Sequence, residues 1–258
     1  MGTLGQIDGC EFSKDNYYII ASDNHAKAKI YVRETGVFVN QVKHLEMDNV
    51  QFERAGKINA VGYSYDRKYF YTGINDHGLK LWDAETYTLV RHFNKTTEVD
   101  GADFSSDGKW LAMAADSEVR VYRVSDLSLV HKFTHDRGAV NNLDFNDDNS
   151  LLASCASKGE VFITRTSDWK RIRRHKFKSS SKRIFFSPDG NLYVVSGRDQ
   201  VCKVFRTSDG EEVADLKQRG NLEMLPGDDY GDENPAIEAL CWTADGQHLL
   251  TGGVVDGT

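Results

Sequence analysis

Six times along this 258-residue chain, an aromatic residue closes a short apolar segment just before a polar turn. Successive aromatic residues lie 51, 41, 41, 41 and 56 positions apart. A sequence that repeats at about 40 residues builds the same small unit several times, and each unit buries its faces against its neighbours. We therefore expect functional surfaces on the rims of the units rather than in a single deep cleft. The six aromatic residues are Phe12, Tyr63, Phe104, Phe145, Phe186 and Trp242.

Each repeat contains the pattern of four short strands joined by three tight turns. Residues 104–108 read FSSDG and residues 186–190 read FSPDG, so an aromatic strand end is followed by a polar turn of the kind that joins hairpins. A strand of small residues follows, as in 110–114, and then a strand of alternating character, as in 78–82. A third turn, such as 34–36, leads into the fourth strand. The pattern predicts an all-β chain, a β-propeller of four-stranded antiparallel blades.

The repeat lengths predict one propeller domain over residues 1–258, with five full blades and a partial sixth. The steps before Tyr63 and Trp242 exceed 41 residues by ten and fifteen, and both additions fall between the last strand of one repeat and the first of the next. In a four-stranded meander all such links emerge at the same end, so we expect the insertions to decorate one face. The predicted blades cover residues 5–43, 57–97, 98–137, 138–178 and 179–217, the partial blade covers 236–258, and the insertions cover 44–56 and 217–235.

Residues 58–93 resemble a repeat of the WD-repeat propeller family. Trp82 and Asp83 stand where that family places its Trp-Asp pair, and Thr72 and Asp76 stand at two positions that the family uses for a buried polar network. The resemblance covers the whole chain in architecture and this one repeat in its signature. In the other complete repeats the Trp position is held by Tyr31, Tyr122, Thr164 and Phe205.

The resemblance also implies a function. The glycine-histidine pair that opens repeats in this family is recognisable at His135 alone. WD-repeat proteins often bind partners on the face that carries the links between blades. The resemblance therefore implies a non-enzymatic scaffold for protein–protein interactions, with other proteins as partners inside a larger complex.

The longer insertion is strongly acidic. Two interpretations stay open: a solvated acidic loop, or a docking loop for a basic segment of a partner. The carboxylates lack the alternating ligand positions of an EF-hand loop, so a calcium site of that type is excluded. The residues that would contact a partner are Asp228, Asp229, Tyr230, Asp232 and Glu233.

A basic stretch, residues 168–183, stands out in a chain whose formal net charge is −7. It is predicted on the outer strand of the fourth blade and the link to the fifth. It protects an edge strand against aggregation, or it binds an acidic protein segment, a phosphate-rich surface such as a phosphoinositide, or nucleic acid. Only Trp169 and Phe177 interrupt it as aromatic residues, so a stacking platform for single strands is not favoured. The basic residues are Lys170, Arg171, Arg173, Arg174, Lys176, Lys178, Lys182 and Arg183.

An alternative function is a propeller hydrolase or lyase, or a ligand-binding propeller, that uses the mouth of the central channel. The second residues of the predicted inner strands are mostly acids and amides, which could hold a hard cation or a polar ligand, or could satisfy backbone groups and water. The sequence contains no glycine-rich phosphate loop, nucleophile elbow or HExxH motif, and it indicates no cofactor. These candidate residues are Asp8, Asn59, Asp100, Asn141 and Glu238, with Lys182 opposing a cation.

The remaining expectations concern the compartment and the end of the sequence. The four cysteines fall on predicted strands without CxxC spacing, so we expect buried free thiols and a reducing, cytoplasmic compartment. Neither a signal peptide nor a membrane span is visible. The cysteines are Cys10, Cys155, Cys202 and Cys241.

The sixth blade has sequence for two strands, and we expect its missing strands to come from the rest of a longer polypeptide or from another chain.

Overall fold

The chain folds into two compact units, Met1–His135 and Asp136–Thr258. Every regular element in the described residues is a β-strand, which confirms the all-β prediction. No helix that could cross a membrane occurs in this described part. The computed structural model describes residues 7–13, 15–23, 25–44, 57–75, 77–94, 99–198, 201–217 and 237–253.

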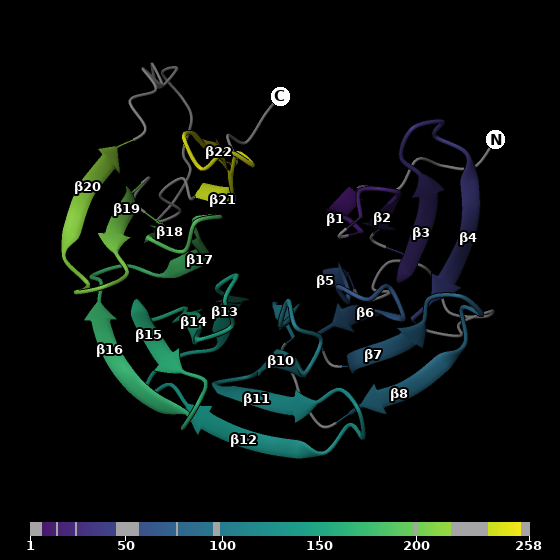
Figure 1. The fold of residues 1–258 in the computed structure, drawn as a ribbon, viewed down its shortest axis with the longest axis horizontal. Helices are drawn as coiled ribbons and strands as arrows, with labels where there is room; N and C mark the ends of the chain where they lie inside the picture. Colours follow the sequence, from purple (N-terminus) through teal and green to yellow (C-terminus); the bar gives the residue numbers. More distant parts are fainter. Residues whose placement is uncertain are drawn as a thin grey trace, which may run out of the picture. The chain divides into compact units, whose positions relative to one another are not determined.

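The first unit contains three four-stranded sheets, each a meander of consecutive antiparallel strands (Figure 1). We call them the first, second and third blades. The first blade comprises β1 (Ile7–Phe12), β2 (Tyr18–Asp23), β3 (Lys27–Val32) and β4 (Phe38–Lys43). The second comprises β5 (Ile58–Tyr63), β6 (Tyr69–Ile74), β7 (Gly78–Asp83) and β8 (Leu89–Phe93). The third comprises β9 (Ala102–Phe104), β10 (Trp110–Ala115), β11 (Glu118–Arg123) and β12 (Leu129–Thr134).

The second unit contains two four-stranded meanders, the fourth and fifth blades, and a two-stranded sheet (Figure 1). The fourth blade comprises β13 (Val140–Phe145), β14 (Leu151–Ala156), β15 (Glu160–Arg165) and β16 (Lys170–Lys176). The fifth comprises β17 (Ser181–Phe186), β18 (Leu192–Gly197), β19 (Val201–Arg206) and β20 (Glu212–Lys217). The hairpin of β21 (Ile237–Trp242) and β22 (Leu249–Gly253) forms the last sheet.

The first turn of each blade is built by the polar residues that the sequence pattern singled out. In the third blade, the Ser105 hydroxyl donates to Asp107 Oδ1 at 2.7 Å and accepts from the Trp110 amide at 2.9 Å. Gly108 has a φ of +68°, a conformation that a residue without a Cβ adopts at no steric cost. The serine therefore satisfies the backbone at the point where the chain reverses, and the aspartate fixes the serine.

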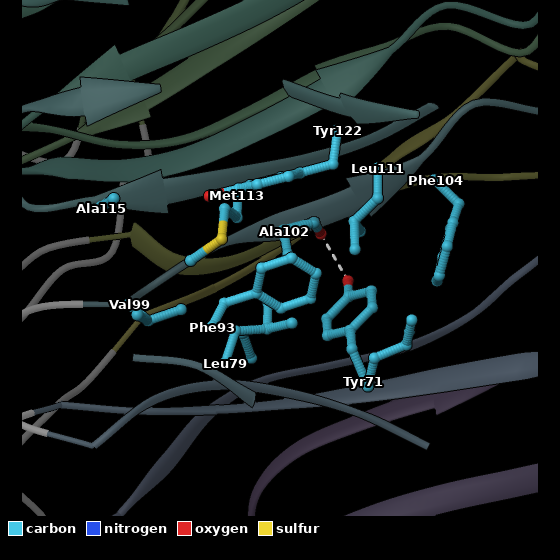
Figure 2. Packing of buried hydrophobic residues seen from close by; sticks show 12 residues of the cluster. Tyr71, Leu79, Phe93, Val99, Ala102, Phe104, Leu111, Met113, Ala115 and Tyr122 are labelled. Carbon is cyan, nitrogen blue, oxygen red and sulfur yellow. Dashed lines mark hydrogen bonds between the residues drawn. The ribbon is translucent and has the colours of Figure 1, made fainter. Parts of the chain in front are cut away.

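The core of the first unit lies between neighbouring sheets. Figure 2 shows Tyr71, Leu79 and Phe93 of the second blade packed against Phe104 and Met113 of the third blade. All are buried, and each fully buried aliphatic or aromatic side chain stabilises the fold by about 1.5–3 kcal/mol. The Tyr71 hydroxyl donates to the Ala102 carbonyl, so the ring adds a polar bond between the sheets to its apolar contact.

The expectation of four buried thiols is wrong for two of them. All four cysteines are free; Cys155 and Cys202 are buried, whereas Cys10 and Cys241 are exposed. Side chains alternate between the two faces of a strand. Cys241 pairs with Leu250, which is 59% exposed, so both lie on the face opposite to the core cluster that contains Leu240.

Candidate functional site

The buried polar network of the second blade joins three side chains. The Trp82 indole Nε1 donates to Thr72 Oγ1 at 2.9 Å, and Thr72 Oγ1 lies 2.7 Å from His44 Nδ1. His44 is fully buried, and Lys80 Nζ donates to its carbonyl at 2.6 Å. Burial, reinforced by the charge of Lys80, lowers the pKa of His44 to about 3. The imidazole is therefore neutral at physiological pH.

This geometry fixes the donor in one of the two bonds, that from Trp82 to Thr72. An indole N–H is a donor only, so Thr72 accepts from Trp82 and its own proton is available for a neutral His44 Nδ1. Asp76, which the resemblance adds to this network, lies outside the described residues. The network ties the link after β4 to β6 and β7, so it joins the first blade to the second.

Sequence reasoning missed His44 because Lys43 rather than a glycine precedes it and because it was assigned to the first insertion, residues 44–56. The offset of His44 from the start of its outer strand could have revealed it. His44 follows Phe38 by six residues, as His135 follows Leu129, and Phe38 and Leu129 have equivalent places in their ladders.

The strand register supports the alignment of the repeats. Trp82 pairs with Leu89 next to a bulge, and Tyr31, Tyr122, Thr164 and Phe205 occupy the same place in the other four complete blades. Trp82 is 7% exposed, as the alignment requires. Thr164 is buried, and within the described residues its hydroxyl has no hydrogen-bond partner.

Aromatic packing replaces the polar network in the fifth blade. By register, Phe177 takes the position of His44, Val195 that of Thr72, and Phe205 that of Trp82. The rings of Phe177 and Phe205 meet edge to face at a centroid distance of 6.0 Å, and Tyr193 stacks on Phe205 at 5.3 Å. The two blades are therefore joined here by an apolar contact.

Three of the candidate channel-mouth residues make contacts between blades. Asn59 Nδ2 donates to Asp100 Oδ1 at 2.9 Å in the first unit, and Asn141 Nδ2 donates to the Ser181 carbonyl at 2.6 Å in the second. Asp100 precedes β9 rather than lying within it. Asp8 and Glu238 lie on β1 and β21, and their side chains fall outside the description.

The described channel-mouth side chains are not grouped as metal ligands. No group of three histidine, cysteine or carboxylate side chains suited to a metal ion occurs in the part of the chain that the structure covers. The amide of Asn141 is used to hold the backbone at the start of β17. The pattern that suggested a polar channel mouth thus includes residues that position neighbouring inner strands.

The basic stretch occupies the outermost strand of the fourth blade, β16, and continues into the fifth blade. Its arginines are engaged within the fold. Arg174 forms ion pairs with Asp136, at 2.9 Å, and with the fully buried Glu160. Arg173 donates to the Ser208 carbonyl, and the guanidinium of Arg171 lies 4.3 Å from the centre of the Phe162 ring.

The lysines of the stretch differ from its arginines. Lys170 lies 3.8 Å from Asp168, a weak contact. Lys176 and Lys178 are exposed, and no ion pair joins either to a carboxylate within the described ranges. Lys182 and Arg183 lie on β17, the innermost strand of the fifth blade, and are half-buried. The part of the stretch available to a partner is therefore the end of β16 and the link after it.

A cavity of about 400 Å³ opens beside Lys176 and Lys178. It lies between the end of β16, the link 177–180 and the strands β18 and β19. Lys176, Lys178 and Arg198 bring positive charge to it. Lys203 also lines it, but its ammonium is paired with Glu212 at 2.8 Å, which raises the pKa of the lysine.

The acidic insertion cannot be placed. Asp228, Asp229, Tyr230, Asp232 and Glu233 all lie outside the described residues, so their role as a docking loop stays a prediction.

Family models identify the class of this protein. The model "WD domain, G-beta repeat" matches residues 50–83 and 85–123, and the model "Anaphase-promoting complex subunit 4 WD40 domain" matches residues 143–225. Together the matched segments make up more than half of the chain. The chain therefore belongs to the WD-repeat family, and its sheets are the blades of a β-propeller, as the sequence predicted.

Several characterised proteins are similar over much of the chain. Pre-mRNA-processing factor 19 homolog 2 of Arabidopsis thaliana is 28% identical over 152 residues, which are 56% of this chain and 28% of that protein. Protein HIR1 of Kluyveromyces lactis is 22% identical over 204 residues, 79% of this chain and 21% of that protein. Target of rapamycin complex subunit LST8 of Saccharomyces cerevisiae is 21% identical over 214 residues, 79% of this chain and 68% of that protein. The chain thus spans less than a third of the length of the first two relatives.

Proposed function

We propose that this chain is a non-enzymatic scaffold that binds protein partners, and that the basic stretch is one of its binding surfaces for an acidic protein segment. The observation that carries the proposal is the exposure of Lys176 and Lys178, without ion pairs among the described residues, in a chain of net charge −7. A fold alone does not define a function, so the argument depends on this surface.

Electrostatics favours an acidic partner. A cluster of like charges on a protein of opposite net charge creates a local potential that attracts acidic segments and speeds their association. Since Arg171, Arg173 and Arg174 are held by contacts within the fold, the lysines are presented from a rigid strand end. A rigid surface loses little conformational entropy when it binds.

The similar proteins support the general role. LST8 is named as a complex subunit, and a relative in Gallus gallus, 18% identical over 206 residues, is named serine-threonine kinase receptor-associated protein. Both names describe association with other proteins. By analogy, this chain acts within a protein complex. A cytoplasmic location and additional contacts through the acidic insertion are parts of the same proposal.

The test compares two double variants with the same change in net charge. Lys176→Glu/Lys178→Glu alters the proposed surface, whereas Lys68→Glu/Lys109→Glu alters two exposed lysines of the first unit that only pair with a neighbouring aspartate. Binding of a fluorescein-labelled peptide rich in Glu and Asp is measured by anisotropy at increasing salt. We expect the first variant to bind roughly tenfold more weakly and the control to bind like the wild type.

Two results would contradict the proposal. Equal affinity of the wild type and Lys176→Glu/Lys178→Glu excludes this surface as the binding site. Tighter binding of single-stranded DNA than of the acidic peptide, lost in the same variant, favours the polyanion alternative instead.

A further inference from the structure

The cavity next to the basic stretch combines cations at its mouth with hydroxyls and an apolar floor. Ser181 and Ser196 line it together with the link serines Ser179 and Ser180. Phe177, Val195 and Phe205 supply its apolar surface. Binding sites for small groups typically have this composition, with an apolar lining and a few polar groups that converge on one point.

One polar group in this lining has no hydrogen-bond partner among the residues that the structure describes. Ser181 is 1% exposed, and its hydroxyl makes no hydrogen bond within the described residues. Buried hydroxyls without a partner are rare in folded proteins, and each asks for an explanation. The Asn141 amide holds the Ser181 carbonyl, so the backbone of this serine is fixed.

The walls of the cavity are held in place by backbone contacts. The Arg198 amide donates to the Ser180 carbonyl at 3.0 Å, and the Ser179 hydroxyl donates to the Arg198 carbonyl at 3.1 Å. Gly197 allows this approach, because a Cβ there would lie 2.6 Å from the Ser180 oxygen. The link and the end of β18 therefore form a preorganised site.

We propose that this cavity binds the phosphate monoester of a phosphorylated side chain on a partner protein. A phosphate monoester carries a charge of about −1.5 to −2 and three strong acceptor oxygens. Lys176, Lys178 and Arg198 match the charge, and Ser181 of the lining has a hydroxyl without a hydrogen-bond partner among the described residues. The apolar floor accommodates the carbon atoms of the side chain. The inference rests on the proposed function and specifies the chemistry of the partner.

A protein segment fits this site better than a membrane or nucleic acid. The net charge of −7 opposes approach to an anionic bilayer, whereas a single side chain feels only the local charge of the cavity. Nucleic acid binding uses an extended basic surface and aromatic stacking. Here Phe177 is packed against Phe205, and the arginines of β16 are engaged in the fold.

The experiment uses the full chain and peptides that differ at one residue. The acidic peptide described above is prepared with a central Ser, phosphoserine, Tyr or phosphotyrosine, and affinities are measured by anisotropy. We expect at least one phosphorylated peptide to bind about tenfold more tightly than its unmodified form. Vesicles of phosphatidylcholine with and without phosphatidylinositol 4-phosphate form a separate arm.

Two serine variants form a matched pair. Ser181→Ala removes the unpartnered hydroxyl, and we expect it to cancel most of the gain from phosphorylation while leaving the unmodified peptide unaffected. Ser196 also lines the cavity, but its hydroxyl donates to the Ile237 carbonyl at 3.1 Å, so Ser196→Ala leaves the gain unchanged. Arg198→Gln, at an exposed position, tests the same site without altering the core.

The outcomes separate this inference from the proposed function. Equal binding of phosphorylated and unmodified peptides, with both weakened by Lys176→Glu/Lys178→Glu, overturns the phosphate site and leaves the acidic-segment surface intact. Loss of the phosphorylation gain in Ser196→Ala but not in Ser181→Ala also overturns it, as does binding to the phosphoinositide vesicles in preference to every peptide. Absence of binding to any peptide overturns both.

Discussion

Replacing Thr72 by Val tests whether the buried polar network stabilises the second blade. The substitution keeps the branched shape and removes only the hydroxyl, which links the Trp82 indole to His44. Both partners would then be buried without their hydrogen bond. Each buried polar group left without a partner costs about 1–3 kcal/mol, so after the gain from one extra buried methyl group we expect a loss of about 2–4 kcal/mol in the free energy of unfolding.

Thr164 provides the matched control. It occupies the position of Trp82 in the fourth blade, is buried, and has a hydroxyl without a partner in the described structure. Thr164→Val should therefore leave the stability unchanged or raise it by about 1 kcal/mol. The same chemical change is thus predicted to destabilise the protein at position 72 and not at position 164.

The assay is urea unfolding combined with hydrogen exchange read by mass spectrometry. Exchange assigns the change to a region, because stability in repeat proteins is a sum of local terms. Thr72→Val should speed exchange in β6 and β7, while Thr164→Val should not speed exchange in β14 and β15. If the two variants lose equal stability, the network is not what holds the second blade, and the reasoning fails.

Three further predictions concern single groups. Trp82→Ala should cost about 3–5 kcal/mol in the free energy of unfolding, measured by denaturation, because it removes a large buried aromatic side chain. His44 has a folded-state pKa of about 3 against 6.5 when unfolded, so the unfolded state binds the proton first and stability falls as the pH drops below 6.5. The loss attributable to His44 between pH 7 and 4.5 should be about 2–3 kcal/mol, and His44→Gln should remove that part of the slope. Iodoacetamide should alkylate Cys10 and Cys241 in the native protein and spare the two buried cysteines; modification of all four at one rate would contradict the burial.

The blades could be predicted because their determinants are local. Alternation along a strand and the polar turns, such as Ser-x-Asp, act within a few residues. The hairpins of each repeat can therefore be predicted from the sequence of that repeat alone. His44 was harder to find, since its partner Thr72 lies 28 residues away across an insertion. A histidine at the end of an outer strand acquires its role from the next blade, and the sequence of its own blade does not show that.

The contacts of the basic stretch also depend on residues distant in the sequence. Charge counting found it, and the alternation of the fourth blade placed it on an outer strand. The pairing of Arg174 with Glu160 and of Arg173 with the Ser208 carbonyl depends on neighbouring strands and on the next blade. Eight basic residues therefore look equivalent in the sequence, while the structure separates the structural arginines from the two available lysines.

The cavity and the loss of the repeat signature have a common origin. Its apolar lining includes Phe177, Val195 and Phe205, the positions that His44, Thr72 and Trp82 hold in the second blade. Where the polar network is kept, the Thr72 hydroxyl is engaged by both Trp82 and His44. Where phenylalanines and a valine replace it, ring contacts and the 2.6 Å contact between His175 Nε2 and the Tyr193 hydroxyl join the blades, and the Ser181 hydroxyl has no partner among the described residues. A degenerate repeat in this family is thus a place to look for a binding site, because the residues that depart from the signature also change which polar groups remain available.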